Sequence, residues 1–460
     1  FTNIKMDSDN SDSNDESDIE FEGRPDGVIV VEMSDSEESR ESTDDTLSLD
    51  DVFFRREDED LNGTPQRNSI NNVQNFDPSL PTQHAYLGEQ MEELSGRTVL
   101  DDDEFVNMVL ISDMSEIGVV VIPGQTIPLT FFHPIMIKEM KSIIQANKTF
   151  GIRYSPEAVY GTTLEIFEYG GGDANESLSV KCKGRQRFKV ISSGRQLNGI
   201  EIGKLKMLPE IVLPDPLMNI HCLSLSRFKV RPKARKLCGS GDSCKVMQSD
   251  AEYFVGKYPI TAWPTWVYKQ YSSDHLVERI MRELRKWKLV EQKVLVIPQN
   301  PLELSYWLAQ SLPLDNAQRQ TILSLNSSIQ RLRYELCILE RCKILCCKYC
   351  GRYTANHEDI FSMSLEGPQG AYVNPGGYVH ETITLHKVNN LNVFARRSVE
   401  HSWFPGYAWS IANCPECSNH MGWLFTATCP SLRPKKFWGI VRNSVVPSLN
   451  AEEQDFKPVI

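Results

Sequence analysis

The sequence predicts an α+β protein of several domains. A mostly β first domain with a helical insertion precedes a β-rich second domain stapled by cysteines, and an acidic stretch comes before both. Three observations support this. Acidic side chains gather at the start of the chain, β-branched runs alternate with turns and helical stripes, and two Cys-x-x-Cys pairs lie near the end. With 460 residues, 40% of them hydrophobic, the chain can form two or three cores.

The start of the chain is a charged tail. Residues 1–60 carry 22 acidic and 5 basic side chains, a net charge of −17, whereas the other 400 residues carry 39 and 44, a net of +5. Such a stretch buries too little apolar surface to offset the entropy that ordering costs. We expect residues 1–75 to be a disordered, solvating tail, with serine phosphorylation as the alternative role, and residues 451–460 to be a second, short tail.

No targeting or membrane segment is visible. The chain has no run of about 18 apolar residues, and its start lacks the basic and apolar regions of a signal peptide. We therefore expect an intracellular protein whose cysteines are thiols or metal ligands rather than disulfides. Six cysteines have no partner at ligand spacing and should be free thiols: Cys182, Cys222, Cys238, Cys244, Cys337 and Cys342.

The first ordered region is rich in strand signals. Residues 119–122 are a β-branched run ended by a turn, which predicts a buried strand, and residues 126–129 should also be extended. Pro134 opens a helix with apolar residues at helical spacing: Ile137, Met140, Ile143 and Ile144. Strands at 162–168 and 178–190 follow around a glycine-rich loop. These elements predict a small β-rich module with one inserted helix.

Short motifs in this module agree in order and separation with a known family. They are Pro128-Leu129, Phe132-His133-Pro134, Gly161-Thr162 and the run from Gly184 to Val190. The module resembles the N-terminal substrate-recognition domain of Lon proteases. In the last motif, Phe188 and Val190 should alternate into the core. Three basic residues should point outward as a solvated face rather than a nucleic-acid site, because no aromatic stacking platform accompanies them: Arg185, Arg187 and Lys189.

Residues 208–290 form a more basic, helical insertion. Ser272-Ser273-Asp274 can cap a helix, preceded by Trp263 and Trp266. Its apolar residues form one stripe: Leu276, Val277, Ile280, Met281, Leu284 and Trp287. The stripe either faces the core or docks on another protein. Docking is the alternative with the more specific functional meaning.

A long connecting helix is expected at 315–345. It begins at Asp315, with a helix-compatible Gln318 three residues on. Apolar residues then recur at spacings of 3 and 4: Ile322, Leu325, Ile329, Leu332, Leu336 and Leu339. Six positions are too few to establish a free coiled coil. We therefore expect the helix to pack on the first domain and to lead into the first cysteine pair.

Two cysteine pairs predict a metal site. Cys347 and Cys350 form one pair, and Cys414 and Cys417 form the other. Together they can supply four thiolates to one tetrahedral zinc ion, which stabilises the fold and leaves no open position for chemistry. Four histidines are competing ligands that a four-sulfur set does not need: His357, His380, His401 and His420. Strand signals between the pairs predict a sizeable β domain: 360–365, 378–385 and 391–394.

Aromatic residues crowd the same region. Trp403 and Trp409 flank a Pro-Gly turn, and Trp423 and Phe425 would share one face of a strand. Core packing explains many tryptophans, yet an aromatic cage is equally consistent, since a buried indole needs a partner for its N–H. Such a cage would hold a cation beside Glu400, or a neutral cyclic imide or amide bound by backbone groups. The residues alone leave both possibilities open.

A set of motifs spans residues 361–446. They are Ala371-Tyr372-Val373-Asn374-Pro375, Gly377 to Thr382, Glu400 to Trp409 and Phe437-Trp438-Gly439. This stretch closely resembles the thalidomide-binding domain of the cereblon family. The Lon-like module, the insertion, the long helix and the acidic tail also follow that family's order. The resemblance implies a Lon N-terminal-like domain at 76–341 and a zinc-bound thalidomide-binding domain at 342–450, and we expect an invertebrate member.

The resemblance also implies a pocket for an imide ring. Three tryptophans would form its walls, Phe425 its base, and Asn374 and Pro375 a loop that closes over it. The implied ligand-binding residues are Asn374, Pro375, Glu400, His401, Ser402, Trp403, Trp409, Trp423 and Phe425. Where the family carries histidine, this chain has Gly376, so the rim loses a side chain and its loop gains freedom. Ile411 should lie near the same surface.

By the same resemblance, the chain would be a non-catalytic substrate receptor of a cullin 4 type RING ubiquitin ligase, in nucleus and cytoplasm. It would recognise C-terminal cyclic imides and glutarimide drugs. The insertion at 208–290 would dock the ligase's β-propeller adaptor, of the damaged-DNA-binding-protein type. No direct contact with nucleic acid or membrane is expected.

Other functions fit the residues less well. A Lon-type protease would need a phosphate-binding Gly-x-x-x-x-Gly-Lys-Ser/Thr loop, which the sequence does not contain. A zinc deaminase would need a proline before the cysteine pair, where this chain has Asn413 before Cys414. A methionine sulfoxide reductase is the most serious enzymatic alternative, but it would need a reactive cysteine at the pocket, for which only Cys429 is a candidate. A reader of methylated lysine is the non-enzymatic alternative.

Overall fold

The computed structural model of the chain describes residues 74–88, 91–112, 119–171, 177–214, 265–287, 289, 292, 295–394 and 396–448. All of them belong to one unit, Asn71–Ile460. Both expected tails, apart from residues 74 and 75, and most of the expected insertion lie outside the described residues, as do Trp263, Cys222, Cys238 and Cys244. None of the described helices is long and apolar enough to cross a membrane.

The first module is a seven-stranded sheet with the strand order β1-β5-β4-β2-β7-β6-β3. β5 also pairs with β6, so the sheet closes on itself as a barrel. Every pairing is antiparallel except that of β2 with β4. The strands are β1 (Glu92–Glu93), β2 (Phe105–Ile111), β3 (Thr126–Phe131), β4 (Thr149–Arg153), β5 (Tyr160–Gly171), β6 (Leu178–Arg195) and β7 (Glu201–Met207).

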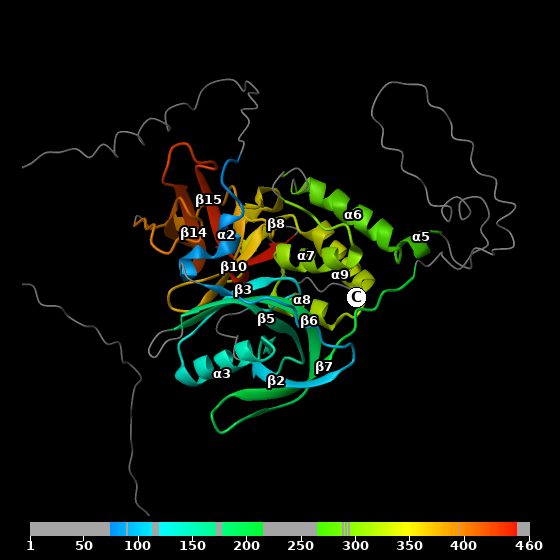
Figure 1. Cartoon of the computed structure of the whole chain (residues 1–460). Helices are drawn as coiled ribbons and strands as arrows, with labels where there is room; N and C mark the ends of the chain where they lie inside the picture. Colours follow the sequence, from blue (N-terminus) through cyan, green and yellow to red (C-terminus); the bar gives the residue numbers. More distant parts are fainter. Residues whose placement is uncertain are drawn as a thin grey trace, which may run out of the picture. The chain divides into compact units, whose positions relative to one another are not determined.

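Three strands and one helix of this module form as the sequence predicts. β3, β5 and β6 cover the expected strands at 126–129, 162–168 and 178–190. Helix α3 (Pro134–Gln145) begins with proline at its first position and buries the apolar stripe Met140, Ile143 and Ile144. In Figure 1, α3 lies beside the barrel, away from the strands of the second module.

The predicted strand at 119–122 is wrong. These four residues are buried, but they pair in no sheet. Side chains bind their carbonyls instead: Arg319 Nη1 donates to Val120 O at 3.1 Å, and Thr162 Oγ1 donates to Val121 O at 2.7 Å. An apolar, β-branched run predicts burial, but it does not reveal whether a neighbouring strand is present.

The helical part consists of α5 (Thr265–Lys269), α6 (Ser273–Lys286), α7 (Pro301–Ser311), α8 (Asn316–Ser324) and α9 (Ser328–Arg341). Helix α6 packs with α7 and α9 (Figure 1). Its apolar stripe faces the core. Its buried members are Leu276, Ile280, Leu284 and Trp287. The core-facing interpretation is therefore correct, since the stripe is already covered. Trp266 on α5 is exposed.

The single helix expected at 315–345 is wrong, because α8 and α9 are separate helices. Asp315 begins α8 as expected, in a reciprocal capping box with Gln318. The backbone is then extended at Leu325 and again at Ser327, which caps α9. α9 ends at Arg341, and the chain turns into a strand three residues later.

Arg187 explains this break and corrects a second expectation. Its side chain is buried rather than outward, with 1% of its surface exposed. Its Nη1 donates to the carbonyls of Leu323 and Leu325, each at 2.9 Å, and its Nε donates to Glu210 at 2.7 Å. The carbonyls at the end of α8 therefore have partners outside the helix. β6 is covered on both faces here, since Phe188 packs into the hydrophobic core.

The second module contains a six-stranded sheet with the order β10-β11-β15-β14-β13-β12 and a three-stranded sheet with the order β16-β8-β9. The six strands are β10 (Gln369–Val373), β11 (Val379–Leu385), β12 (Asn392–Val393), β13 (Tyr407–Asn413), β14 (His420–Ala427) and β15 (Lys436–Val441). The three are β8 (Ile344–Cys347), β9 (Tyr353–Asn356) and β16 (Val445–Ser448). β11 and β12 match expected strands. The strand predicted at 360–365 is wrong, because only Ile360 forms a bridge.

The start of the described chain packs on the second module. Figure 1 shows α2 (Leu80–Gln83), in blue, beside that module's strands. The ring of Phe76 lies 5.5 Å from that of Tyr407, and its N–H donates to Arg433 O at 3.3 Å. This segment, expected to begin the first domain, thus contributes to the aromatic core of the second.

A buried cluster of charges joins the two modules. Glu381 on β11 accepts hydrogen bonds from Arg319 at 2.7 Å, from Arg442 at 2.8 Å and from Gln125 of the first module at 2.7 Å. Burial alone would raise the pKa of Glu381, but the two guanidinium charges lower it to about 2. The carboxylate therefore stays ionised where the modules meet.

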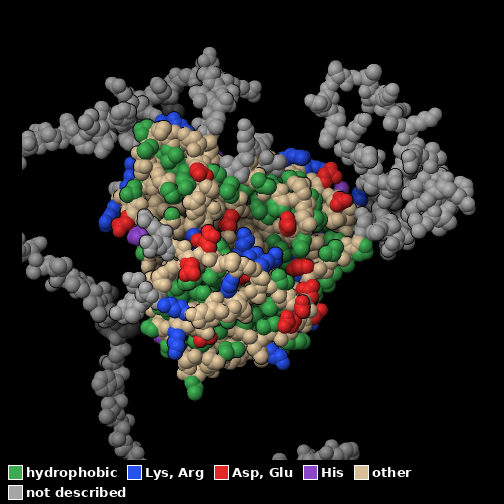
Figure 2. Space-filling view, viewed as in Figure 1, with side chains coloured by type: hydrophobic (Ala, Val, Ile, Leu, Met, Phe, Trp, Pro, Cys, Tyr) green, Lys and Arg blue, Asp and Glu red, His purple; other side chains and the backbone are tan. Residues whose placement is uncertain are grey.

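The modules also share apolar packing. Residues of the barrel and α3 form one hydrophobic cluster with Ala371, Val373 and Val379 of the second module. On the face shown in Figure 2, side chains of both charges are interspersed, in keeping with the near balance of charge outside residues 1–60. The second module is thus fixed on the first by a common core as well as by charge.

Candidate ligand pocket and zinc centre

Four cysteine sulfurs converge at one end of the β13–β14 hairpin. The Sγ atoms of Cys347, Cys350, Cys414 and Cys417 all lie within 4.8 Å of one another. Cys347 and Cys417 are 3.7 Å apart, and Cys350 and Cys414 are 3.6 Å apart. Zinc–sulfur bonds of about 2.3 Å in a tetrahedron require sulfurs about 3.8 Å apart. The cluster therefore fits one structural zinc ion.

The two knuckles have matching turns. Gly351 N–H donates to Cys347 O, and Ser418 N–H donates to Cys414 O, both at 2.9 Å. Gly351 and Ser418 both have positive φ, 73° and 58°. An ion pair between Arg352 and Glu416 links the knuckles. None of the four histidines considered as competing ligands belongs to the cluster.

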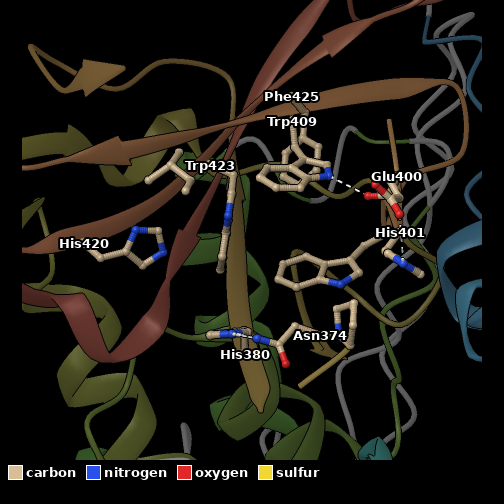
Figure 3. A pocket seen from close by; sticks show the side chains of 11 residues that line it. Asn374, His380, Glu400, His401, Trp409, His420, Trp423 and Phe425 are labelled. Carbon is tan, nitrogen blue, oxygen red and sulfur yellow. Dashed lines mark hydrogen bonds and ion pairs between the residues drawn. The ribbon is translucent and has the colours of Figure 1, made fainter. Parts of the chain in front are cut away.

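A second site lies further along the same hairpin, as a cavity of about 500 Å³. Trp409 on β13 pairs in register with Phe425 on β14, and Ile411 pairs with Trp423, so these four side chains share one face. Figure 3 shows the indoles of Trp409 and Trp423 facing the cavity, with Phe425 behind Trp409. Phe425 is 1% exposed and forms the floor.

The third tryptophan comes from the loop before β13. The ring of Trp403 stacks on Tyr372, with centroids 5.1 Å apart, and meets Trp423 nearly at right angles, with centroids 4.7 Å apart. Its Nε1 donates to Val373 O at 3.3 Å. Trp409 Nε1 donates to Glu400 O at 2.9 Å (Figure 3). Because both indole N–H groups are bonded, these rings can serve as walls without leaving a buried donor unpaired.

Most of the residues implied by the resemblance line this cavity. They are Asn374, Pro375, Glu400, His401, Trp403, Trp409, Trp423 and Phe425, together with Ile411. Ser402 is the exception. Its Oγ donates to Phe404 O at 3.1 Å, and it lines a neighbouring hollow. Whether the lining residues bind a ligand stays a prediction.

Two histidines in the wall were not expected there. His380 on β11 and His420 on β14 flank Trp423 in Figure 3, with ring centroids 5.1 and 4.7 Å from it. Burial and the neighbouring His420 lower the pKa of His380 to about 4, and burial lowers the pKa of His420 as well. Both rings are therefore neutral at physiological pH. Strand pairing brings them to the pocket, and no spacing in the sequence indicates this.

Comparison with known protein families agrees with the two modules. Residues 116–341 match the model of the ATP-dependent protease La (LON) substrate-binding domain. Residues 343–457 match a model described as Yippee zinc-binding/DNA-binding/Mis18, centromere assembly. The chain is thus a two-module protein in which a Lon-type substrate-binding domain carries a zinc domain of the Yippee type.

Curated relatives define the family. The chain is 43% identical to protein cereblon of Gallus gallus over 403 residues, which are 84% of this chain and 87% of that protein. It is 40% identical to protein cereblon of Xenopus tropicalis over 85% of this chain and 90% of that one. It is 28% identical to the Drosophila grimshawi protein over 90% of this chain and 61% of that protein, and such insect matches are consistent with an invertebrate member. The chain belongs to the cereblon family.

Proposed function

We propose that this member of the cereblon family is a non-catalytic substrate receptor of a cullin 4 type RING ubiquitin ligase, acting in nucleus and cytoplasm. Its pocket binds C-terminal cyclic imides of target proteins, and it accepts glutarimide drugs in the same way. The receptor holds the bound protein near the ubiquitin-charged enzyme. It thereby raises the local concentration of target lysines and makes no bond itself.

The observation that carries this proposal is the convergence of Trp403, Trp409 and Trp423 on one cavity. Within the described part of the chain, neither the His401 carbonyl nor the Trp403 N–H has a hydrogen-bond partner. Both residues line the cavity. A cyclic imide offers one N–H donor flanked by two carbonyl acceptors, so it can bond to both backbone groups while its ring contacts the indoles.

The charges of the lining favour a neutral ring over a cation. His380 and His420 are neutral, and the Glu400 side chain is 80% exposed, with its carboxylate 3.7 Å from His401 Nε2. An exposed carboxylate at the rim contributes less to holding a methylated ammonium group than a desolvated one inside the cage. The methyl-lysine reader is therefore the second candidate.

The reductase alternative lacks its nucleophile at this site. None of the residues that line the cavity is a cysteine. Cys429, the candidate named from the sequence, is exposed and lies outside that lining. The four thiolates of the cluster would already saturate a tetrahedral zinc ion, which leaves no coordination position for a substrate.

Calorimetry with two ligands tests the proposal. We expect glutarimide to bind the wild-type protein, a trimethyl-lysine peptide to bind much more weakly, and Trp403→Ala to abolish glutarimide binding. Binding of the peptide alone, or glutarimide binding that survives Trp403→Ala, would contradict the receptor function of the pocket. Thermal melting of the variant distinguishes a lost contact from a lost fold.

A test of adaptor docking should delete less than the whole insertion. Removing residues 208–290 would take away α6 and expose the core that it covers. A deletion of 215–264 spares α6 and Glu210, which accepts hydrogen bonds from Arg187 and Arg331. We expect this deletion to abolish co-purification of the β-propeller adaptor while glutarimide still binds. Retained co-purification would contradict docking through this segment.

A further inference from the structure

A second hollow adjoins the pocket. It measures about 360 Å³, and His401 lines both cavities. Its other lining residues come from the start of the described chain, from the loop before β13 and the first residue of β13, and from the residue after β14: Tyr86, Val399, Ser402, Pro405, Gly406, Tyr407 and Thr428. We call it the outer hollow. The two cavities therefore lie next to each other, with His401 as the lining residue that they share.

The wall between the two cavities has an uncommon backbone. His401 has a φ of 51°, the left-handed region that residues other than glycine seldom adopt. Ser402 N–H donates to Val399 O at 3.3 Å, which holds this tight turn. Such conformations cost free energy and persist where the surroundings impose them, often beside a ligand. Here the turn places one residue between the two cavities.

Two hydroxyls of the outer hollow, those of Thr428 and Ser402, can accept hydrogen bonds from a ligand. Thr428 Oγ1 donates its proton to Gly406 O at 2.9 Å, and Ser402 Oγ donates to Phe404 O at 3.1 Å. A hydroxyl has one proton and two lone pairs, so each oxygen can still accept a hydrogen bond. Thr428 is exposed and reachable from solvent. The hollow therefore suits a ligand with N–H donors.

The remaining lining is neutral. Apart from His401, the residues that form the outer hollow have no carboxylate, ammonium or guanidinium group. Val399 and Pro405 add apolar surface beside the hydroxyls. A segment of peptide backbone offers N–H donors and apolar carbon without a required charge, and it is what precedes a cyclised C-terminal residue in a protein.

We propose that the outer hollow binds the one or two residues that precede the cyclic imide in a target protein, with Thr428 Oγ1 accepting a hydrogen bond from their backbone. This inference rests on the proposed imide function and extends it. The first cavity recognises the modified end, and the outer hollow recognises that the end belongs to a polypeptide. The tightness of binding then depends on the residues before the imide as well as on the ring.

Two ligands of different length test the proposal by calorimetry. One is free glutarimide, and the other is an acetylated tripeptide whose C-terminal glutamine is cyclised to the imide. We expect the tripeptide to bind several-fold more tightly to the wild type. Thr428→Val should remove about 3- to 10-fold of the tripeptide affinity, as expected for one lost hydrogen bond, and leave that of glutarimide unchanged. Thr321→Val is the matched control, because that hydroxyl also donates to a carbonyl, Ala317 O, on α8.

The outcomes separate this inference from the proposed function. If glutarimide itself does not bind, the proposed function fails. If glutarimide binds but the tripeptide is no tighter, or Thr428→Val weakens both ligands equally, the outer hollow holds only solvent and the inference is overturned. A benzoylphenylalanine placed before the imide gives a second measurement on the unmodified protein. Photo-cross-links should map to 399–407 or Thr428, and cross-links confined to other segments would contradict the proposal.

Discussion

The β13–β14 hairpin carries two sites of opposite kind within a few residues: a closed metal site at its turn and an open cavity along its strands. The turn holds Cys414 and Cys417, whose sulfurs complete a closed four-thiolate set. The strands hold Trp409 and Trp423, whose faces border a cavity of about 500 Å³. The four thiolates leave a bound zinc ion no open coordination position, whereas the other site leaves apolar surface and backbone groups open. The closed site therefore stabilises the hairpin, and the open site is available for a ligand.

The comparison also gives the two sites an order of dependence. The turn that the cysteines close joins the two strands that place Trp409 opposite Phe425 and Ile411 opposite Trp423, with one irregularity in the pairing, between Ala412 and Asn413. Loss of the turn should disturb the pocket, whereas loss of a pocket side chain should leave the turn intact. The first prediction tests this asymmetry.

Cys414→Ser should have the largest effect. It leaves three thiolates, and structural zinc in small domains contributes on the order of 10 kcal/mol to folding. We expect loss of zinc, loss of the ordered second module and loss of glutarimide binding together. Metal analysis by mass spectrometry, with circular dichroism, measures this. Cys429→Ser is the control, because that exposed thiol lies outside the cluster. Full zinc content with intact folding in Cys414→Ser would rule out the four-sulfur site.

Glu381→Gln tests a second closed site, one that is held by charge without a metal. Removing the carboxylate leaves Arg319 and Arg442 buried and facing a neutral amide, which costs about 3–5 kcal/mol. Urea unfolding at pH 7 measures the loss. Glu340→Gln is the control, since its pair with Arg279 is exposed to solvent and should contribute under about 1 kcal/mol.

The same carboxylate predicts how stability depends on pH. Its folded pKa of about 2 lies below the ordinary 4.5, so its contribution is complete above pH 4.5 and declines as the pH falls toward 2. The difference in stability between wild type and Glu381→Gln should shrink over that window. A difference that stays constant from pH 7 to pH 3 would show that Glu381 does not titrate as the buried charges require.

Elements with strong local patterns could be predicted from the sequence. α3 and α6 have apolar residues at helical spacing, and β5 and β6 follow clear turn signals. The errors depend on partners far along the chain. Arg187 on β6 takes the carbonyls that end α8, and Arg319 takes a carbonyl of the run at 119–122. Apolar spacing records which residues are buried, but it does not record which side chain satisfies a backbone group.

The candidate site divides in the same way. The cysteine spacing alone indicates the zinc centre, because each pair occupies one short turn. The three tryptophans indicate an aromatic cluster, but only the family resemblance assigned them to one pocket. His380 and His420 were considered as metal ligands, since histidine near cysteine pairs suggests zinc. Their place in the wall follows from the pairing of β11 and β14 with β15, which no local motif encodes.

Two adjacent glycines in the loop over the pocket should differ in how well they tolerate substitution by alanine. A Cβ at Gly376 would lie 3.4 Å from Asn374 Oδ1, an ordinary contact, so Gly376→Ala should change the free energy of unfolding by less than about 1 kcal/mol. Gly377 has a φ of 84°, and its Cβ would lie 2.6 Å from the Phe132 ring of the first module. We expect Gly377→Ala to cost about 1–3 kcal/mol. Equal melting temperatures for the two variants would contradict this difference.

The smallest predicted effect concerns the open site and proton binding. A pKa of about 4 leaves His380 only about 1% protonated at pH 6, whereas an unperturbed histidine with a pKa of 6.5 would be mostly protonated there. Because the folded pKa is depressed, the neutral ring is fully favoured above pH 6.5, and protonation becomes appreciable only as the pH approaches 4. Glutarimide affinity, measured by tryptophan fluorescence, should therefore change less than about twofold between pH 8 and pH 5.5.

The zinc centre sets the lowest pH at which the affinity can be measured, because protons compete with the metal for the thiolates at lower pH. His380→Phe keeps a ring of similar size without a titratable nitrogen, so its profile should be as flat as that of the wild type. A wild-type midpoint near pH 6.5 that disappears in His380→Phe would mean that the wall becomes charged just below physiological pH. The cavity would then favour anionic over neutral ligands. A flat profile in both proteins would instead confirm that burial keeps the wall of the open site neutral, in contrast to the charged thiolates of the closed site.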